Sequence, residues 1–401
     1  MENVVICGAA RTPIGGFQGA FDAVPAARLG GAAIEAALQQ TSLSSVDEVV
    51  MGNVLGAGQG QAPARQASFH AGLGAQVPAT TLNKMCGSGM KATMIGFDQI
   101  ALGQTQVMAV GGMESMSNAP YLLPKMRGGA RLGHSQVADH MFLDGLEDAY
   151  ENGRLMGSFA EDCAEKYQFT REAQDDYALR SLIRAREAQS SGAFENEITP
   201  FNLARKKGDY AVMQDEQPLN AKPEKIPHLK PAFRADGSVT AANASSISDG
   251  AAALIVSSQT HMQQAGLPCR ARILGHASHA QEPAWFSTAP IFATRKLLDR
   301  LNWRVEDIDL WEVNEAFAVV PMAFMNELDI SGDIINVHGG ACALGHPIGA
   351  SGARIIVTLL HAMERRDVKR GIAAVCIGGG EGTAGNTCAN DDNIKMLHLS
   401  H

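Results

Sequence analysis

Residues 80–93 read TTLNKMCGSGMKAT, a stretch that joins a short β-like run, a glycine-bracketed turn and the start of a helix. Gly87 and Gly89 permit a tight turn directly after Cys86, because glycine adopts backbone conformations that other residues avoid. The pattern predicts a strand, a turn and a helix with a single thiol in the turn. Units of this kind build α/β proteins.

Short runs rich in Val and Ile alternate with Ala-rich helical segments along much of the chain. This alternation predicts an α/β fold with largely parallel, buried strands. The expected strands include residues 4–7, 48–51, 106–110, 334–337 and 372–377, and the expected helices include residues 26–40 and 352–365.

The two ends of the chain resemble each other. SSVDEVVMGNV (44–54) matches VEDIDLWEVNE (305–315), which places Asn53 opposite Asn314. Each half then continues with a glycine-rich turn, a helix, a second strand and a GG-x-E sequence. The pattern predicts an internal duplication.

At nearly the same offset Cys86 falls beside His346, and VMAVGGMES (107–115) resembles AAVCIGGGEG (373–382). Two duplicated α/β halves that pack together would bring equivalent turns to one seam. The thiol and the imidazole could therefore lie close in space.

Residues 118–244 are richer in charge and proline and poorer in strand-like runs, so they read as an insertion. Within it, residues 170–192 predict one helix that Thr170 can cap. The expected division is a first half of residues 1–260, which contains the insertion, and a second half of residues 268–401.

Composition limits the function. The chain has 401 residues, 45% of them hydrophobic, which is enough for two cores. A net charge of −9 argues against neutralising nucleic-acid phosphates. The N-terminus lacks signal-peptide features, and no apolar run reaches the ~18 residues of a membrane span. Because the seven cysteines lack metal-ligand or disulfide spacing, we expect a cytoplasmic protein without bound metal.

Cys86 has two interpretations of about equal weight. A thiol at a helix N-terminus feels the positive end of the dipole, which would lower its pKa and make it a nucleophile. It could equally be a small buried hydrophobe, as most cysteines are.

His346 lies in GGACALGHPIGASGAR (339–354), where small residues allow close backbone contact and Pro347 fixes the chain. A core histidine would not need these glycines, so a site is favoured. His346 could take the Cys86 proton as general base.

Two further segments carry polar groups at strand ends. CIGGGEG (376–382) places Cys376 before glycines whose N–H groups can face an oxyanion. NEAF (314–317) places Asn314 where it could cap a helix or hold a water or a substrate carbonyl. Spacing does not decide between the two roles of Asn314.

With Cys86, NEAF, GHPIGASGAR and CIGGGEG in this order, the chain resembles the thiolase family, and within it the biosynthetic acetyl-CoA acetyltransferases. The resemblance runs from the first strand to about Gly385 and rests on four separate motifs. It implies a duplicated, layered αβαβα core with an inserted cap region, a homotetramer and a place in fatty acid metabolism.

The resemblance implies condensation of two acetyl-CoA to acetoacetyl-CoA and CoA, and the reverse thiolysis. Cys86 would carry the acyl group, His346 would take its proton, and Cys376 would remove the α-proton of the second acetyl-CoA. One oxyanion hole would comprise His346 and a water held by Asn314. The other would comprise the N–H groups of Cys86 and Gly378.

Coenzyme A would be a substrate and product, with no cofactor bound permanently. By resemblance its pantetheine arm would contact Met156, Phe233, Ser245, Ala316 and Phe317. The nucleotide end would meet basic residues of the insertion, namely Arg205, Lys206, Lys207, Lys222, Lys225, Lys230 and Arg234. A solvated charged loop is the alternative for that run.

Some positions depart from the family pattern. Leu155 replaces a usual histidine, Pro218 a usual arginine and Cys342 a usual branched aliphatic residue. Phe286 would face the acyl pocket by resemblance and favours a short one. Residues 121–141 resemble the loop that joins dimers into tetramers.

Four other functions compete with this one. A degradative 3-ketoacyl-CoA thiolase would accept longer chains on the same fold. A ketoacyl synthase would be expected to show a second active-site histidine where the chain has Cys376. A non-catalytic CoA or lipid carrier would need none of the three reactive residues, and a metal-binding protein would need closely spaced ligand pairs.

Overall fold

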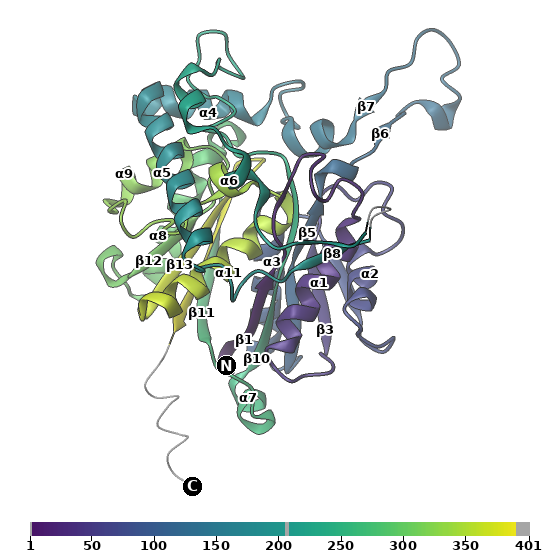
Figure 1. Ribbon diagram of the computed structural model, residues 1–401, viewed down its shortest axis with the longest axis vertical. Coiled ribbons are helices and arrows are strands. Elements are labelled where there is room, and N and C mark those ends of the chain that lie inside the picture. The colour runs from purple at the N-terminus through teal and green to yellow at the C-terminus, as the bar shows by residue number, and fades with distance from the viewer. Residues whose placement is uncertain (1, 205–207, 390–401) are drawn as a thin grey trace.

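The computed structural model describes residues 2–204 and 208–389, and most of its described strands belong to one long twisted sheet (Figure 1). These strands are β1 (Val4–Arg11), β2 (Gly15–Gly16), β3 (Glu48–Gly52), β4 (Ala79–Leu82), β5 (Val107–Ser115), β10 (Ser248–Ser258), β11 (Ala271–Ala280), β12 (Leu310–Val313), β13 (Arg370–Ile377) and β14 (Glu381–Ala389). Their order is β12-β13-β14-β11-β1-β10-β5-β3-β4, with β2 beside β10.

The strand directions are mixed, so the prediction of a largely parallel sheet was wrong. Only the pairs β3–β4, β3–β5 and β12–β13 are parallel among the described strands, and the other pairs in this sheet are antiparallel. β1, β5 and β10 are buried along their whole length. A continuous apolar run indicates that a strand is buried on both faces, as parallel strands usually are. It does not indicate strand direction.

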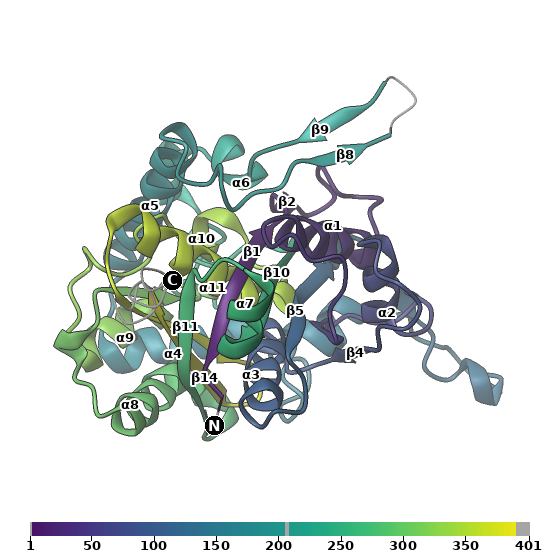
Figure 2. The ribbon, with the colours of Figure 1, turned by 90° about the horizontal axis from the view of Figure 1, so that it is seen from below.

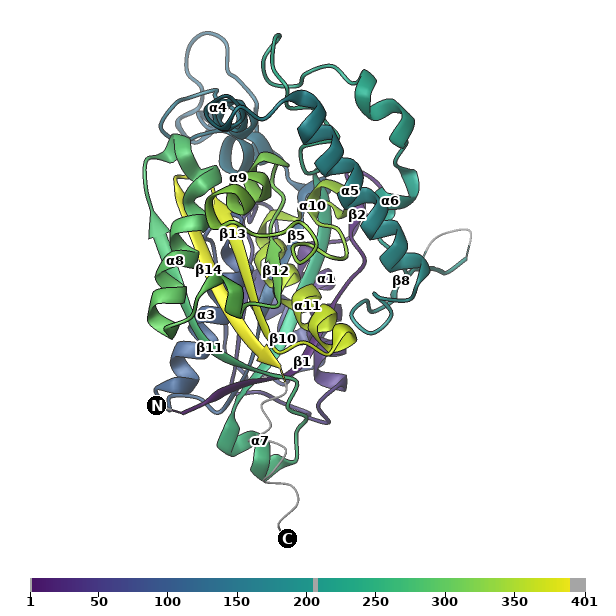
Figure 3. The same ribbon diagram turned by 90° about the vertical axis from the view of Figure 1, so that its left-hand side faces the viewer.

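Helices pack on the outer faces of the sheet and between its two halves, which gives a layered arrangement. They are α1 (Ala26–Gln39), α2 (Pro63–His70), α3 (Ser88–Ala101), α7 (Gln259–Ala265), α8 (Ala289–Leu301), α9 (Val319–Leu328), α10 (Ala341–Leu344) and α11 (Ile348–Arg366). α1 packs on β5 and β10 on one outer face, and α8 packs on β11 and β14 on the other. α3 and α11 lie between the two halves, and Figure 3 shows α8 and α11 on opposite sides of β13 and β14. This is the predicted αβαβα core.

The two halves repeat the same arrangement, as the sequence predicted. β3, β5, β10 and β1 are neighbours in that order, and so are β12, β13, β14 and β11. α3 and α11 are the matching inner helices. The expected strand at residues 334–337 is reduced to an isolated parallel bridge between Trp311 and Ile335, in the position that β4 holds beside β3.

The inserted region lies outside the main sheet (Figures 1 and 2). Its described elements are β6 (Tyr121–Leu122), β7 (Ala138–Asp139), α4 (Met156–Tyr167), α5 (Arg171–Ser190), β8 (Phe201–Leu203), β9 (Tyr210–Val212) and α6 (Glu216–Asn220), with short 3-10 and π turns between them. The predicted helix is α5, and Thr170 caps it by accepting from the Ala173 N–H.

Candidate active site

Cys86 lies in the turn between β4 and α3, as residues 80–93 predicted. Met85 adopts a left-handed conformation with φ of 46°, and its N–H donates to Asn83 Oδ1 at 2.9 Å. The Ser88 hydroxyl donates to the Met85 carbonyl at 2.7 Å. These bonds hold the thiol two residues ahead of the helix.

His346 stands in the equivalent place of the second half, two residues ahead of α11. Its N–H donates to the Ser246 carbonyl at 3.0 Å. α11 begins at Ile348, earlier than the predicted residue 352, because Pro347 precedes it in an extended conformation and its carbonyl accepts the first bonds of the helix.

The beginnings of α3 and α11 touch backbone to backbone. A Cβ atom at Gly89 would lie 2.6 Å from the Ala353 nitrogen, and one at Gly352 would lie 2.5 Å from the Met90 nitrogen. Real Cβ atoms do not approach other atoms so closely, so any side chain at either glycine would push the helices apart. This contact places the turns of Cys86 and His346 at one seam.

The third turn at the seam is the hairpin between β13 and β14. Cys376 lies near the end of β13, and residues 378–380 form a three-glycine loop in which Gly379 and Gly380 have φ near 90°. The Gly378 N–H is close enough to the Cys86 sulfur to favour its anionic form. Burial raises the pKa of Cys376 well above its ordinary value, and the neighbouring Cys86 thiol acts in the same direction, so the two thiols lie close together.

Burial keeps both Cys86 and His346 uncharged in the free protein. It raises the pKa of the Cys86 thiol to about 11, against the opposing effect of N–H groups from Gly378 and Cys86 itself. It lowers the pKa of His346 to about 3, and the nearby charge of Arg354 acts in the same direction. The prediction of a helix dipole that raises the thiolate fraction was therefore wrong. Cys86 precedes the first turn, where the dipole acts, and desolvation is the larger effect.

We expect the alkylation of Cys86 by iodoacetamide to be slow at pH 7 and to accelerate about tenfold per pH unit up to pH 10. The thiolate is the reactive form, and its fraction rises with pH as long as the pH stays below the pKa. Peptide mapping by mass spectrometry measures the rate, with N-acetylcysteine as the unburied control. A rate that levels off below pH 8 would contradict a neutral resting thiol.

Ser351 fixes the proton of His346. Its oxygen lies 2.5 Å from His346 Nδ1, and its hydroxyl donates to the Pro347 carbonyl at 2.9 Å. Because that hydroxyl hydrogen is used, the Ser351 oxygen must accept from Nδ1–H, which assigns the neutral tautomer with an open lone pair on Nε2. His346 Nε2 is buried and has no partner among the described residues. Sequence reasoning missed Ser351, although it stands in the segment that holds His346.

Replacing Ser351 with alanine should lower kcat about fivefold. A hydrogen bond of this kind contributes about 1 kcal/mol, and its loss lets the imidazole rotate or change tautomer. Ser351→Thr keeps the hydroxyl and is the matched control. Steady-state thiolysis with thermal unfolding measured in parallel gives the test, and an unchanged kcat in a well-folded Ser351→Ala protein would refute the assignment.

Asn314 follows β12 and carries two unpaired polar atoms. Its N–H donates to the Ala374 carbonyl at 2.9 Å, whereas Nδ2 and Oδ1 are both buried without a partner among the described residues. Asn314 does not cap a helix, because α9 begins only at Val319. Its counterpart Asn53 donates to Glu114 Oε1 at 2.8 Å. Buried polar groups require partners, so Asn314 marks a place for a water or a ligand.

The five residues expected at the pantetheine arm lie close together beside this seam. The Ser245 N–H donates to the Ala316 carbonyl at 2.9 Å, and the Phe233 and Phe317 rings meet edge to face at 6.0 Å. A Cβ at Gly378 would lie 3.6 Å from the sulfur of Met156, so this group of residues adjoins the glycine loop.

The apolar surroundings of Cys86 come from another cluster. Cys86 packs against a group that includes Val54, Leu55, Met116, Met141 and Ile348, none of which the sequence singled out. Phe286 is buried among other aromatic rings instead, 6.4 Å from both Phe159 and Phe317.

The basic residues of the insertion that the structure describes differ in their surroundings. Arg234 is paired with Asp162 and donates to the Ser158 carbonyl at 3.2 Å. Lys222, Lys225 and Lys230 are exposed. Arg205, Lys206 and Lys207 lie outside the described residues.

The three residues that depart from the family pattern make ordinary packing and hydrogen-bond contacts. Leu155 is half-buried directly ahead of α4, and the Pro218 carbonyl accepts from Arg186 Nε at 2.8 Å. The Cys342 sulfur lies 3.6 Å from the Asn243 carbonyl oxygen. In the described ranges we find no group of three or more potential ligands that could hold a metal ion and no helix long and apolar enough to cross a membrane.

Comparison with known families identifies the class. The thiolase N-terminal domain matches residues 4–260, and the thiolase C-terminal domain matches residues 267–387. The chain belongs to the thiolase family.

Its relatives include acetyl-CoA acetyltransferases. The protein of that name from Pseudomonas aeruginosa is 50% identical over 388 residues, which is 96% of this chain and 98% of the relative. The acetyl-CoA acetyltransferase of Cupriavidus necator is 46% identical, with coverage of 96% and 98%.

Two solved structures have the same fold. The crystal structure of the Bacillus anthracis acetyl-CoA acetyltransferase superposes with a TM-score of 0.94 at 40% identity, over 97% of this chain and 99% of the other. An Ascaris suum thiolase in complex with coenzyme A gives 0.91 at 41% identity, over 97% and 100%.

Proposed function

We propose that this protein is an acetyl-CoA C-acetyltransferase that condenses two acetyl-CoA to acetoacetyl-CoA and CoA and catalyses the reverse thiolysis. The observation that carries the proposal is the seam itself. The Cys86 sulfur meets the Gly378 N–H there, the Cys376 thiol lies close by, and His346 offers an unpaired Nε2. The near-full-length similarity to acetyl-CoA acetyltransferases supports the same reaction.

In the first half-reaction, His346 Nε2 takes the Cys86 proton as the sulfur attacks the thioester carbonyl. The N–H groups of Cys86 and Gly378 bind the oxyanion, and each such donor contributes about 3 kcal/mol. The C–S bond to coenzyme A then breaks, and Cys376 gives its proton to the departing CoA thiolate. The enzyme is left as an S-acetyl thioester with a Cys376 thiolate and an imidazolium at His346.

In the second half-reaction, the Cys376 thiolate removes a proton from the methyl group of a second acetyl-CoA. The imidazolium of His346 and a water held by Asn314 bind the enolate oxygen. The carbanion attacks the S-acetyl carbonyl and expels the Cys86 thiolate, which takes back the proton of His346. All three residues then return to their starting protonation states.

Both halves of the duplication contribute residues to the reaction. Cys86 comes from residues 1–260, and Cys376 and His346 come from residues 268–401. The pantetheine arm is held by the group of Met156, Phe233, Ser245, Ala316 and Phe317. The exposed Lys222, Lys225 and Lys230 are available for the nucleotide phosphates. Coenzyme A enters and leaves as a substrate, and the residues assigned here require no resident cofactor.

The test is a substrate series. Purified protein should convert acetoacetyl-CoA and CoA to acetyl-CoA, with kcat/KM falling at least tenfold when the 3-ketoacyl chain is lengthened from four to eight carbons. Comparable kcat/KM values across that series would instead favour the degradative 3-ketoacyl-CoA thiolase. No thiolysis of any length would refute both enzymes.

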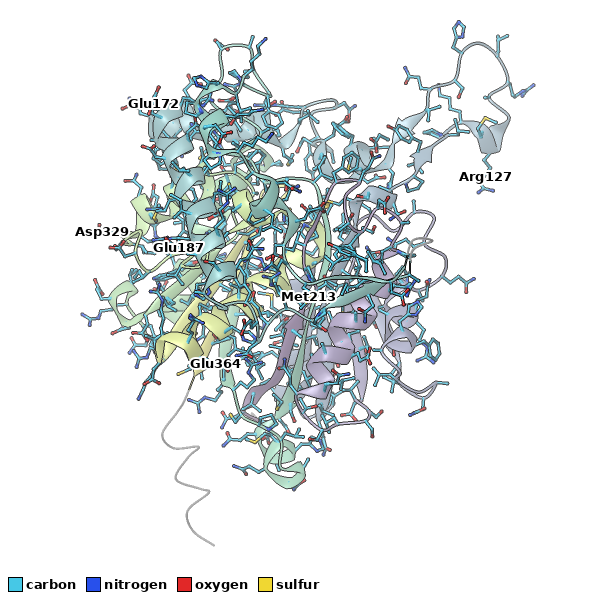
Figure 4. All side chains as sticks on the ribbon, in the orientation of Figure 1. Arg127, Glu172, Glu187, Met213, Asp329 and Glu364 are labelled. Atoms are coloured by element: carbon cyan, nitrogen blue, oxygen red, sulfur yellow. The ribbon has the colours of Figure 1, made fainter. Side chains whose placement is uncertain are left out.

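We also propose that the protein is a homotetramer joined through an arm of residues 121–141. The arm projects from the body beyond the paired strands β6 and β7, and Arg127 points away from it near its tip (Figures 1 and 4). Leu132 is 98% exposed there. The same arm exposes further large apolar side chains, and a group of this kind favours burial against another copy. They are Tyr121, Leu123, Met126 and Val137.

Light scattering at micromolar concentration should give about four times the chain mass of 42.4 kDa. Leu132→Asp should reduce the assembly to dimers, because a buried unpaired charge disfavours the contact. Leu102→Asp, at another exposed leucine, is the matched control. A monomeric mass for the unmodified protein would contradict the proposal.

A further inference from the structure

An ion pair joins the two halves directly beside the proposed oxyanion hole. Lys84 Nζ contacts Glu381 Oε2, and the two side chains are 24% and 36% exposed. Lys84 stands two residues before Cys86. Glu381 follows the three-glycine loop that begins at Gly378, so each partner belongs to one of the two segments whose N–H groups would bind the oxyanion.

Both partners are fixed on their own segments. The Lys84 N–H donates to the Ser88 hydroxyl at 2.8 Å, and its carbonyl accepts from the Gly87 N–H at 3.1 Å. Glu381 opens β14 and pairs with Ile377 across the hairpin. A bond between their side chains therefore constrains the Cys86 turn against the glycine loop.

The glycine loop needs such a constraint. Residues 378–380 are all glycine, and glycine has the greatest backbone freedom of any residue. The Gly378 N–H must nevertheless stay within hydrogen-bond reach of the Cys86 site. Within the loop the Gly380 carbonyl accepts from the Gln281 N–H at 2.9 Å. Glu381 adds a fixed point at the end of the loop.

A second carboxylate also links the two halves at this seam. Glu114 lies within β5, two residues after the Gly111–Gly112 pair. The Glu114 carboxylate accepts from the Gly349 N–H at 2.8 Å, on the helix that starts just after His346, and from the Val54 N–H at 3.0 Å. Each half thus extends a carboxylate to the turn that carries the reactive residue of the other half.

We propose that the Lys84–Glu381 pair is a positioning device that sets the Gly378 N–H against Cys86 for oxyanion binding. This inference rests on the proposed function and adds two positioning residues to it. Half-exposed ion pairs contribute little to stability. The pair should therefore act on turnover and leave folding and substrate binding nearly unchanged.

The test uses Lys84→Met and Glu381→Gln, which remove one charge each, and the reversed double variant K84E/E381K. We expect each single change to lower kcat of acetoacetyl-CoA thiolysis about tenfold with KM within twofold, less than the 10²- to 10³-fold loss of a whole oxyanion donor. The reversed pair should recover at least half of that loss on a logarithmic scale. Lys84→Arg, which keeps the charge, should stay within threefold of the unmodified protein.

Glu327→Gln is the matched control, because Glu327 forms an ion pair of similar exposure with Arg295 at 3.1 Å outside the proposed site. Its kcat should not change. A kcat within twofold of the unmodified protein in both single variants overturns the inference, and so does a loss that the reversed pair fails to restore. In either case acetylation of Cys86, followed by intact mass, tells whether the proposed function itself still stands.

Discussion

Replacing Cys86 with alanine should abolish acetyl transfer, with a loss of about 10⁴-fold or more in kcat for thiolysis and condensation. Removing the nucleophile of a covalent mechanism leaves only binding and oxyanion stabilisation, so the reaction loses its acyl carrier. Intact mass after mixing with acetyl-CoA should show one added acetyl group in the unmodified protein and none in the variant.

Cys7→Ala is the control for a general effect of thiol removal. Cys7 is buried in β1 and packs in the core cluster of the first half, which contains none of the residues assigned to catalysis. It should acetylate normally. If the Cys86→Ala protein still acquired an acetyl group, or kept measurable turnover, Cys86 would not be the nucleophile.

Replacing Cys376 with alanine should separate the two half-reactions. We expect turnover to fall about 10³-fold or more, because no other described thiol is assigned to remove the α-proton and general base catalysis contributes 10²- to 10⁴-fold. The first half-reaction should slow but persist, since the CoA thiolate is a good leaving group even without a proton donor. An acetyl group on Cys86 should therefore accumulate and stay.

Rapid quenching followed by intact mass measures this accumulation, and deuterium exchange into the methyl group of acetyl-CoA reports the proton removal. The Cys376→Ala protein should lose the exchange. Retained exchange would assign the base to another group, and a complete failure to acetylate would contradict the expected separation of the two half-reactions.

The local units of the fold could be predicted because their signals lie within a few residues. The turn after Cys86, the capped helix that became α5 and the duplication of the two halves all follow from spacing and turn residues. Strand direction could not be predicted in the same way. β1, β5 and β10 are buried along their whole length, so their apolar runs look like those of parallel strands.

The site residues could be named from motifs, but their charge states could not. The helix dipole is a local property that a sequence reveals, whereas the burial that raises the Cys86 pKa comes from segments remote along the chain, such as the residues packed around Met116 and Ile348. The same reason explains Asn314. Its capping role looked possible locally, but the helix begins at Val319 and leaves the amide unpaired.

Contacts between side chains of the two halves could not be predicted from the sequence either. Lys84 and Glu381 lie 297 positions apart in the sequence, and neither has an unusual local context. Arg234 shows the opposite case, because its place in a basic run favoured a ligand contact although Asp162 occupies it. A run of basic residues in a sequence shows only its composition. The packing of the folded chain determines which of these charges are paired with acidic side chains.

A crystal structure of the protein soaked with acetyl-CoA tests the convergence of the three turns most directly. We expect an acetyl group on the Cys86 sulfur, with its carbonyl oxygen about 2.7–3.1 Å from the N–H groups of Cys86 and Gly378. Cys376 and His346 Nε2 should face the same acetyl group. An unmodified Cys86 beside bound coenzyme A, or an acetyl group on any other residue, would contradict the assignment.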